Sequence, residues 1–430
     1  MISQMKLDFS QVPSDWKGYP VHYKIINQAL EQIADGSITM DTRASDTSIN
    51  IDSTQTPPGN YLFTVRLPSG KTLMQPFQIE TDKQTTLLVP YDNSPHEWLG
   101  SQTLLGHSLN LKQYTTLLEK FSGSDPIAKA ANASKMDWQF FYPQFSNKSI
   151  LLYKSDMSVQ QISDAFHLIL SFGGQNFDRS TVAELRIGGS VKSVMLPPLS
   201  RREQHDVLSL DLYWATPDIT SIDQVTIGVN LQNKRAQALL SYMKLGDIES
   251  AQKVSGPVIE EAQQMFKDKM LDLGAALAAA YLLTRTSAWT RMPLDWCDNL
   301  SNFFPYISDG AIINAHRQIV ELKSEVSSND LARIAQLLIT AVDRGIPIFS
   351  AGLRLLNDDL QALKNSIEAS QNSLTDPKAP VAKQLADTLK EVTVACKRVA
   401  NYLRYSDFSN SFTTLTFSNE EAHKVIFTYQ

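Results

Sequence analysis

Cys297 and His316 are the residues whose types and spacing could carry out nucleophilic chemistry in this chain. They lie nineteen positions apart on two consecutive predicted helices. If those helices pack antiparallel, the thiol and the imidazole would meet, and Asp309 at the start of the second helix could orient the ring. The flanking residues are apolar, as in a packed core: Leu294, Leu300, Phe303 and Phe304. The sequence therefore favours a buried thiol and a hydrogen-bonded helical histidine, with a cysteine-dependent hydrolase using Cys297 and His316 as the alternative.

Other catalytic and cofactor-binding patterns are not recognisable in the sequence. The seven histidines never fall at zinc-site spacing with a second ligand, and no CxxC pair occurs. No glycine-rich phosphate loop is present, and Gly188-Gly189-Ser190 lacks the strand–helix context of a serine nucleophile. The acidic pairs Asp358-Asp359 and Glu260-Glu261 are predicted on the polar sides of helices. We therefore predict no catalytic, cofactor-binding or metal site and no cofactor.

The composition describes a folded, mildly acidic chain. Of its 430 residues 43% are hydrophobic, which is enough for a buried core, and the length predicts about three domains. The net charge of −6 and the lack of a Lys/Arg run argue against a sequence-independent nucleic-acid binder. No apolar stretch reaches the roughly 18 residues that cross a bilayer, and the N-terminus lacks a signal-peptide core. We expect a soluble cytoplasmic protein in which Cys297 and Cys396 are buried free thiols.

The N-terminal part divides into two predicted units. Residues 1–36 are predicted to form an arm and one amphipathic helix that ends at Gly36, because apolar residues recur at helical spacing as Val21, Ile25, Ile26, Ala29, Leu30 and Ile33. Residues 37–95 are predicted to form a small β-sandwich, in which Tyr61, Phe63 and Val65 alternate with residues of the opposite face. The breaker cluster 92–95 marks the boundary.

Residues 96–233 are predicted to form a second β-rich domain with a helical insertion. Residues 207–214 and 224–231 are its clearest strands, and Gly188-Gly189 is a predicted turn between strands. Helical spacing predicts helices near residues 114–121 and 156–169 within the insertion.

The C-terminal half is predicted to be helical. Residues 234–406 contain three helix pairs at irregular spacing, which indicates stacked helical hairpins with Gly345 at a helix end. Residues 407–430 are predicted to form a C-terminal β-hairpin. The fold class is thus α+β and multidomain: β-sandwich modules, an all-α helical-hairpin, solenoid-like domain, and a terminal β-hairpin.

Two further features are candidates for contact with a partner. One is an aromatic cluster that either forms an interaction patch or, as the sequence favours, a domain-interface core: Trp138, Phe140, Phe141 and Tyr142. The other is a proline-preceded dibasic pair, Arg201 and Arg202, which is predicted to be a protease-sensitive loop. Exposed Trp98 or Trp138 would instead indicate a carbohydrate-binding protein.

Two stretches resemble known protein modules. The pattern PPGNY…LPSGK…PFQI…TTLLVP in residues 57–90 resembles carboxypeptidase-regulatory or prealbumin-like sandwiches, which occur as accessory modules in bacterial proteins. The stretches LLSYMKLGDIESA and LDWCDNLSNFFPYISDGAIINAHRQ are similar to helical regions of bacterial proteins encoded beside caspase-like or CHAT peptidases. This resemblance implies that the chain is a partner, regulator or cleavable substrate of such a protease.

Together these patterns predict a non-enzymatic interaction or scaffold protein. The stacked helices would bury a partner helix or peptide in a groove. A protein partner is expected, and neither nucleic acid nor a membrane is.

Overall fold

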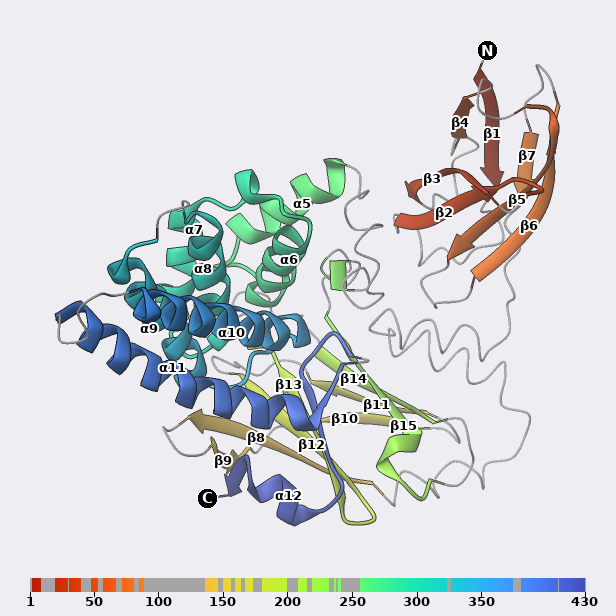
Figure 1. The fold of residues 1–430 in the computed structure, drawn as a ribbon. Helices are drawn as coiled ribbons and strands as arrows, with labels where there is room; N and C mark the ends of the chain where they lie inside the picture. The colour runs from red at the N-terminus through yellow and green to blue at the C-terminus, as the bar shows by residue number, and fades with distance from the viewer. Residues whose placement is uncertain are drawn as a thin grey trace.

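The fold is described from a computed structural model of the chain. It describes residues 2–8, 20–29, 31–39, 48–52, 57–66, 72–80, 85–88, 136–145, 150–155, 159–163, 167–172, 180–198, 208–214, 219–231, 236, 239–240, 256–322, 326–373, 380–408 and 410–429. The mixed α+β class is confirmed: strands dominate the N-terminal half and helices the C-terminal half, with strands again near the C-terminus (Figure 1).

The N-terminal strands form two sheets. One has three strands in the order β4-β1-β7 and the other has four strands in the order β3-β2-β5-β6. The alternation predicted for residues 61–65 is confirmed, because Tyr61, Phe63 and Val65 are buried on β5. The strands are β1 (Ile2–Asp8), β2 (Pro20–Ile26), β3 (Gln32–Thr39), β4 (Ser48–Asp52), β5 (Gly59–Arg66), β6 (Thr72–Ile79) and β7 (Thr85–Leu88).

The predicted helix near residues 21–33 is wrong, because this segment is the β2–β3 hairpin. Ile25 is buried and pairs with Phe63 across the sheet, which is the two-residue period of a strand. Asn27 turns the chain: its side chain accepts a hydrogen bond from the Glu31 backbone N–H at 2.9 Å. The spacing that suggested a helix arises from two strands on either side of this turn.

A second β region follows, made of two sheets. The seven-stranded sheet has the order β16-β17-β13-β12-β8-β9-β18, and the four-stranded sheet has the order β10-β11-β14-β15. Residues of both sheets share one apolar cluster, so the sheets pack face to face. The strands are β8 (Asp137–Phe145), β9 (Ile150–Lys154), β10 (Gln160–Ser163), β11 (His167–Phe172), β12 (Thr181–Ile187), β13 (Ser190–Leu196), β14 (Leu208–Trp214), β15 (Val225–Asn230), β16 (Ser406–Asp407), β17 (Thr414–Phe417) and β18 (Phe427–Tyr429).

The strands predicted at 207–214 and 224–231 are confirmed as β14 and β15. The turn at Gly188 and Gly189 is also confirmed: their φ angles of 58° and 86° fit the two-residue hairpin that joins β12 to β13. The helix predicted near 156–169 is wrong, because that segment contains β10 and β11, paired with each other and with β14. The helix predicted near 114–121 lies outside the described residues.

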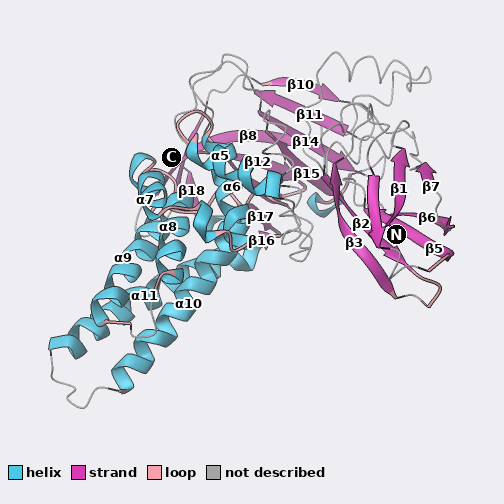
Figure 2. Cartoon of the chain, turned by 90° about the horizontal axis from the view of Figure 1, so that it is seen from above, coloured by secondary structure: helices cyan, strands magenta, loops and turns pink. Residues whose placement is uncertain are grey.

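The helices form the second half of the molecule. Helices α9, α10 and α11 contact one another and run side by side away from the sheets (Figure 2). Gly345 follows the end of α9, as predicted, with φ of 103°. The helices are α5 (Gly256–Lys267), α6 (Leu273–Arg285), α7 (Leu294–Phe303), α8 (Ser308–Val320), α9 (Ser328–Asp343), α10 (Ser350–Asn372), α11 (Pro380–Tyr405) and α12 (Glu420–Lys424).

The middle of the seven-stranded sheet is buried on both faces. On one face Ala183 and Leu185 of β12 join the cluster that contains the four-stranded sheet and α6. On the other face Val182 and Val191 join a cluster that contains α9, α10 and α11. The sheet and the helices therefore share their cores.

The two C-terminal strands occur where predicted, and both join the seven-stranded sheet. β17 pairs antiparallel with β13, whereas β18 pairs parallel with β9 near the opposite edge. They therefore pair with other strands of the sheet and not with each other, and the short helix α12 lies between them in sequence.

Candidate functional site

The structure gives the two members of the predicted Cys–His pair different environments and different partners. Cys297 on α7 is fully buried, and burial raises the pKa of its thiol to about 12. A thiol with that pKa is almost entirely protonated at neutral pH, so it is a poor nucleophile. Both Cys297 and Cys396 are free and buried, as predicted.

His316 is bound to a carboxylate that the sequence did not predict as its partner. Its Nδ1 lies 2.9 Å and 3.0 Å from the two carboxylate oxygens of Asp359 on α10. Burial raises the pKa of Asp359, whose side chain is only 8% exposed. The prediction that the pair Asp358-Asp359 lies on a polar helix side is therefore wrong for Asp359, which faces α8.

Asp309 does not orient His316. Its carboxylate is fully buried and accepts hydrogen bonds from the Tyr281 hydroxyl at 2.9 Å and from the Ile348 and Phe349 backbone N–H groups at 2.8 and 3.4 Å. It thus ties the start of α8 to α6 and to the segment before α10. The three residues of the predicted catalytic set have separate partners.

The predicted aromatic patch lies in the interior. Phe140 and Phe141 on β8 are buried, and they point into the two clusters on opposite faces of the sheet. Trp138 and Tyr142 are partly buried against the first cluster. These rings therefore form a core between the sheet and the helices, and they do not form an exposed interaction patch. Arg201, Arg202 and Trp98 lie outside the described residues.

A polar cluster, which we call the C-terminal cluster, joins α12 and β18 to β12 around two buried side chains, Glu184 and His423. It consists of Glu184, Arg186, Glu420, His423 and Tyr429. Glu184 is fully buried, with His423 Nε2 at 2.7 Å from one carboxylate oxygen and the Tyr429 hydroxyl donating to the other at 2.8 Å. Arg186 forms ion pairs of 3.1 Å with both Glu184 and Glu420. Nothing in the local sequence near His423 indicates this pairing, because its partner lies 239 positions away.

A groove on the helical region is a surface site that the sequence did not single out. It has a volume of about 360 Å³ and lies between α7, the end of α8 and the start of α9. We call it the acidic groove, and its lining residues are Leu294, Asp298, Gln318, Glu321, Leu322, Asp330 and Arg333. Leu294, which the sequence predicted as core, is 40% exposed here.

Internal hydrogen bonds orient the charged side chains of the acidic groove. Asp298 accepts a hydrogen bond of 2.8 Å from the Asn314 side chain. Asp330 accepts one of 2.7 Å from the Ser327 hydroxyl, and Ser327 holds the pKa of Asp330 below its usual value. Glu321 pairs with Arg317, one turn earlier on α8. The groove therefore presents three ordered carboxylates, of which Glu321 is paired with Arg317 and Asp330 lies 3.4 Å from the Arg333 guanidinium.

The part of the chain that the structure describes contains neither a metal-binding cluster nor a membrane-spanning helix. No group of three or more His, Cys, Asp or Glu side chains among the described residues is arranged to hold a metal ion. Within the same residues, every helix is too short or too polar to span a bilayer.

Comparisons with known proteins give one match of substance. Residues 238–426, less than half of the chain, match the family model described as the Y4kD C-terminal domain. No curated protein matches the chain. Among solved structures, the chain is similar to a 9R-lipoxygenase from Cyanothece at 10% identity, with a TM-score of 0.15, over 92% of this chain and 86% of that chain. A structural similarity with so low a TM-score supports no inference about this chain. The match covers the helices from α5 to α12 together with β16 and β17, and it ends before β18.

Proposed function

We propose that this chain is a non-enzymatic interaction protein, and that its acidic groove binds a segment of a partner protein containing both basic and apolar residues. The observation that carries the proposal is the lining of the groove. Exposed Leu294 and neighbouring Leu322 offer apolar contact, and Asp298, Glu321 and Asp330 stand around them. This is the arrangement by which helical surfaces take up a short amphipathic segment.

Electrostatics favours a basic partner segment. Three carboxylates against two guanidiniums, that of Arg333 and that of Arg317 beside Glu321, leave the acidic groove with a small negative balance, which attracts Lys and Arg side chains and raises the rate of encounter. The carboxylates already have internal partners, and each carboxylate can still accept further hydrogen bonds, since it has about four acceptor positions. A Lys or Arg side chain of the partner can therefore donate hydrogen bonds to carboxylates whose positions are already fixed.

The partner class is taken from the resemblance of the chain to proteins encoded beside caspase-like or CHAT peptidases. On this basis the partner is such a protease, and the dibasic pair Arg201-Arg202 is the position at which the chain would be cut. The cytoplasm is the proposed location, which agrees with two free cysteines. No observation on the described residues favours the cysteine hydrolase.

Site-specific photo-crosslinking tests the proposal. A photoreactive amino acid placed at Leu294 in the full chain should crosslink to a partner segment rich in Lys and Arg, identified by mass spectrometry. The same group at Val394, an exposed apolar position on α11 outside the groove, is the matched control. With the partner purified, Leu294→Glu should weaken binding at least tenfold, and Val394→Glu should leave binding within twofold of the original.

Two outcomes would count against the proposal. One is that Leu294 and Val394 crosslink to the same proteins. The other is that the crosslinked segment is acidic, which would contradict the charge argument even if the groove is a binding site.

A further inference from the structure

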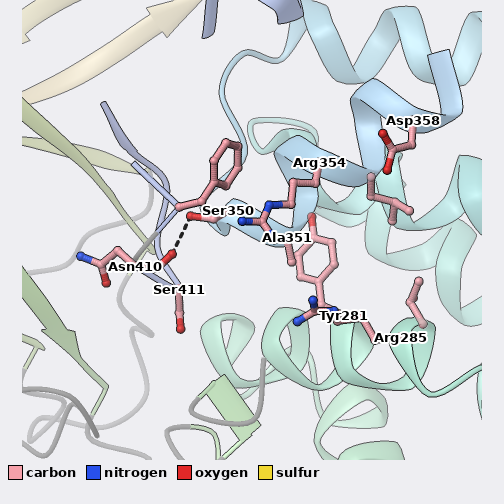
Figure 3. Close-up of a pocket in the computed structure, with 11 residues that line it drawn as sticks. Tyr281, Arg285, Ser350, Ala351, Arg354, Asp358, Asn410 and Ser411 are labelled. Atoms are coloured by element: carbon pink, nitrogen blue, oxygen red, sulfur yellow. Dashed lines mark hydrogen bonds between the residues drawn. The ribbon is translucent and has the colours of Figure 1, made fainter. Parts of the chain in front are cut away.

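A second cavity lies where the helices meet the chain segment that precedes β17. It has a volume of about 240 Å³ and lies between α6, the start of α10 and the residues Phe408, Asn410 and Ser411 (Figure 3). We call it the arginine pocket. Its lining residues are Tyr281, Thr284, Arg285, Ser350, Ala351, Arg354, Leu355, Asp358, Phe408, Asn410 and Ser411. None of these residues belongs to the acidic groove.

Two guanidinium groups face this pocket from different helices. Arg285 ends α6 and Arg354 lies on the second turn of α10. Burial and the nearby positive charge of Arg354 lower the pKa of Arg285, so the two like charges lie close enough to repel each other. Arg354 is held over the Phe408 ring, with its guanidinium carbon 4.2 Å from the ring centre. Two guanidiniums that line one pocket from different helices form a site suited to a doubly charged anion.

The remaining walls add polar groups and fix the shape of the pocket. Ser350 is the first residue of α10, and its hydroxyl donates to the Asn410 carbonyl at 2.8 Å, while its N–H donates to the Ser411 carbonyl at 2.9 Å. These two hydrogen bonds fix the start of α10 against Asn410 and Ser411. Tyr281, Leu355 and Phe408 provide apolar wall next to the charges.

One carboxylate, that of Asp358, also lines the pocket, and its position determines where in the pocket the positive charge lies. Asp358 lies one turn beyond Arg354 on α10, and its carboxylate accepts a hydrogen bond from the Asn357 side chain at 3.2 Å. Figure 3 shows the Arg354 guanidinium directed towards Ser350, with Asp358 at the far side of the pocket. The positive charge is thus concentrated at the end of the pocket near Ser350 and Tyr281.

We propose that the arginine pocket binds the phosphate group of a small phosphomonoester. Arg285 and Arg354 would hold the phosphate oxygens, which match the fork of donors on each guanidinium. The apolar wall formed by Tyr281, Leu355 and Phe408 would contact the organic part of the ligand. The volume of about 240 Å³ suits a small molecule and excludes a folded macromolecular surface.

Phosphorus NMR titration of the full chain tests this site, with inorganic phosphate and phenyl phosphate as probes. Arg285→Gln and Arg354→Gln should each weaken binding of both probes at least tenfold. Arg404→Gln is the matched control, because Arg404 is exposed and also lies near an aromatic ring, Tyr405, at 5.6 Å. It should change binding by less than twofold.

A protection experiment on the unaltered protein covers the case in which an arginine variant fails to fold. Phenylglyoxal modifies arginine, and phenyl phosphate should slow modification of Arg285 and Arg354 at least fivefold while leaving Arg404 unaffected. The proposal is overturned if phosphate produces no saturable change, if Arg404→Gln weakens binding as much as the pocket variants, or if acetate protects as well as phenyl phosphate.

Discussion

Asp309 shows what a single buried charge does in this protein. Its carboxylate is surrounded by three donors, from Tyr281, Ile348 and Phe349, which satisfy its oxygens. Burial still dominates: it raises the pKa of Asp309 from 3.8 to about 6. The hydrogen bonds of Asp309 therefore connect three segments of the chain, and their contribution to stability depends on whether the carboxyl group is protonated.

The stability of the protein should fall as Asp309 ionises. Between pH 4 and pH 6 the native state binds the Asp309 proton more tightly than the unfolded chain does, so raising the pH through this window lowers the free energy of unfolding. A shift of this size corresponds to about 3 kcal/mol, because each pKa unit is worth about 1.4 kcal/mol. Urea unfolding followed by tryptophan fluorescence, from pH 4 to pH 7, measures the change.

Asp309→Asn isolates this effect, since the amide cannot ionise. The difference in unfolding free energy between the unaltered protein and the variant should fall by about 2.4 kcal/mol from pH 4 to pH 7, most of the full effect. All other titrating groups are common to both proteins and cancel in this difference. A difference that stays constant across this range would show that Asp309 keeps its ordinary pKa.

At the residue scale, the sequence predicted which side chains are buried better than it predicted their hydrogen-bond partners. The apolar neighbours of Cys297 correctly indicated a buried thiol. The partners of His316 and Asp309 could not be predicted, because they lie 43 and 28 to 40 positions away and are selected by helix packing. Local spacing contains no information on contacts of that kind.

At the element scale, the end of α9 is fixed by a glycine that packs against the sheet. Gly345 has φ of 103°, a conformation that side chains with a Cβ rarely adopt. A Cβ added at this position would overlap the ring of Phe145 on β8. This one residue thus both ends a helix and allows the helical region to approach the sheet.

Gly345→Ala should therefore lower the free energy of unfolding by at least about 3 kcal/mol, since backbone strain and overpacking both contribute. Gly189→Ala is the matched control, because Gly189 also has positive φ, at 86°, yet nothing lies within 4 Å of an added Cβ. The Gly189→Ala change should lower the free energy of unfolding by about 1 kcal/mol. Chemical unfolding of both variants measures the comparison, and equal losses would show that the contact with Phe145 is unimportant.

The elements that the sequence predicted correctly are those with an unbroken pattern. β14 and β15 alternate clearly, and long helices such as α10 and α11 repeat over many turns. The β2–β3 and β10–β11 segments were predicted as helices because two short strands around a turn can imitate helical spacing. Only pairing with distant strands, such as β5 and β14, distinguishes the two cases.

At the scale of the whole molecule, the helical half depends on the sheet that precedes it in sequence. β17 pairs with β13 and β18 pairs with β9, although β9 and β13 lie before residue 238, where the Y4kD family match begins. The cluster around α9, α10 and α11 also includes Leu152 and Val182 from the same sheet. Part of the hydrophobic core of the matched region is therefore supplied by strands that lie outside it.

A fragment comprising residues 238–430 should not fold by itself. It should show no near-ultraviolet circular dichroism and should bind a hydrophobic dye, because its apolar helix faces lack their partners. A fragment of residues 136–430 should unfold cooperatively in urea. Cooperative unfolding of the shorter fragment would show that the sheet is not needed for its stability.

The placement of β17 and β18 has a consequence for biosynthesis. The central strands β8, β9, β12 and β13 leave the ribosome first, and the strands that flank them follow only after the entire helical region. At about 5–20 residues per second, that interval is roughly 10–40 s. Throughout it the nascent chain carries unpaired strand edges of the kind that nucleate aggregation, so chaperone protection during translation matters more for this protein than for one whose sheet is contiguous in sequence.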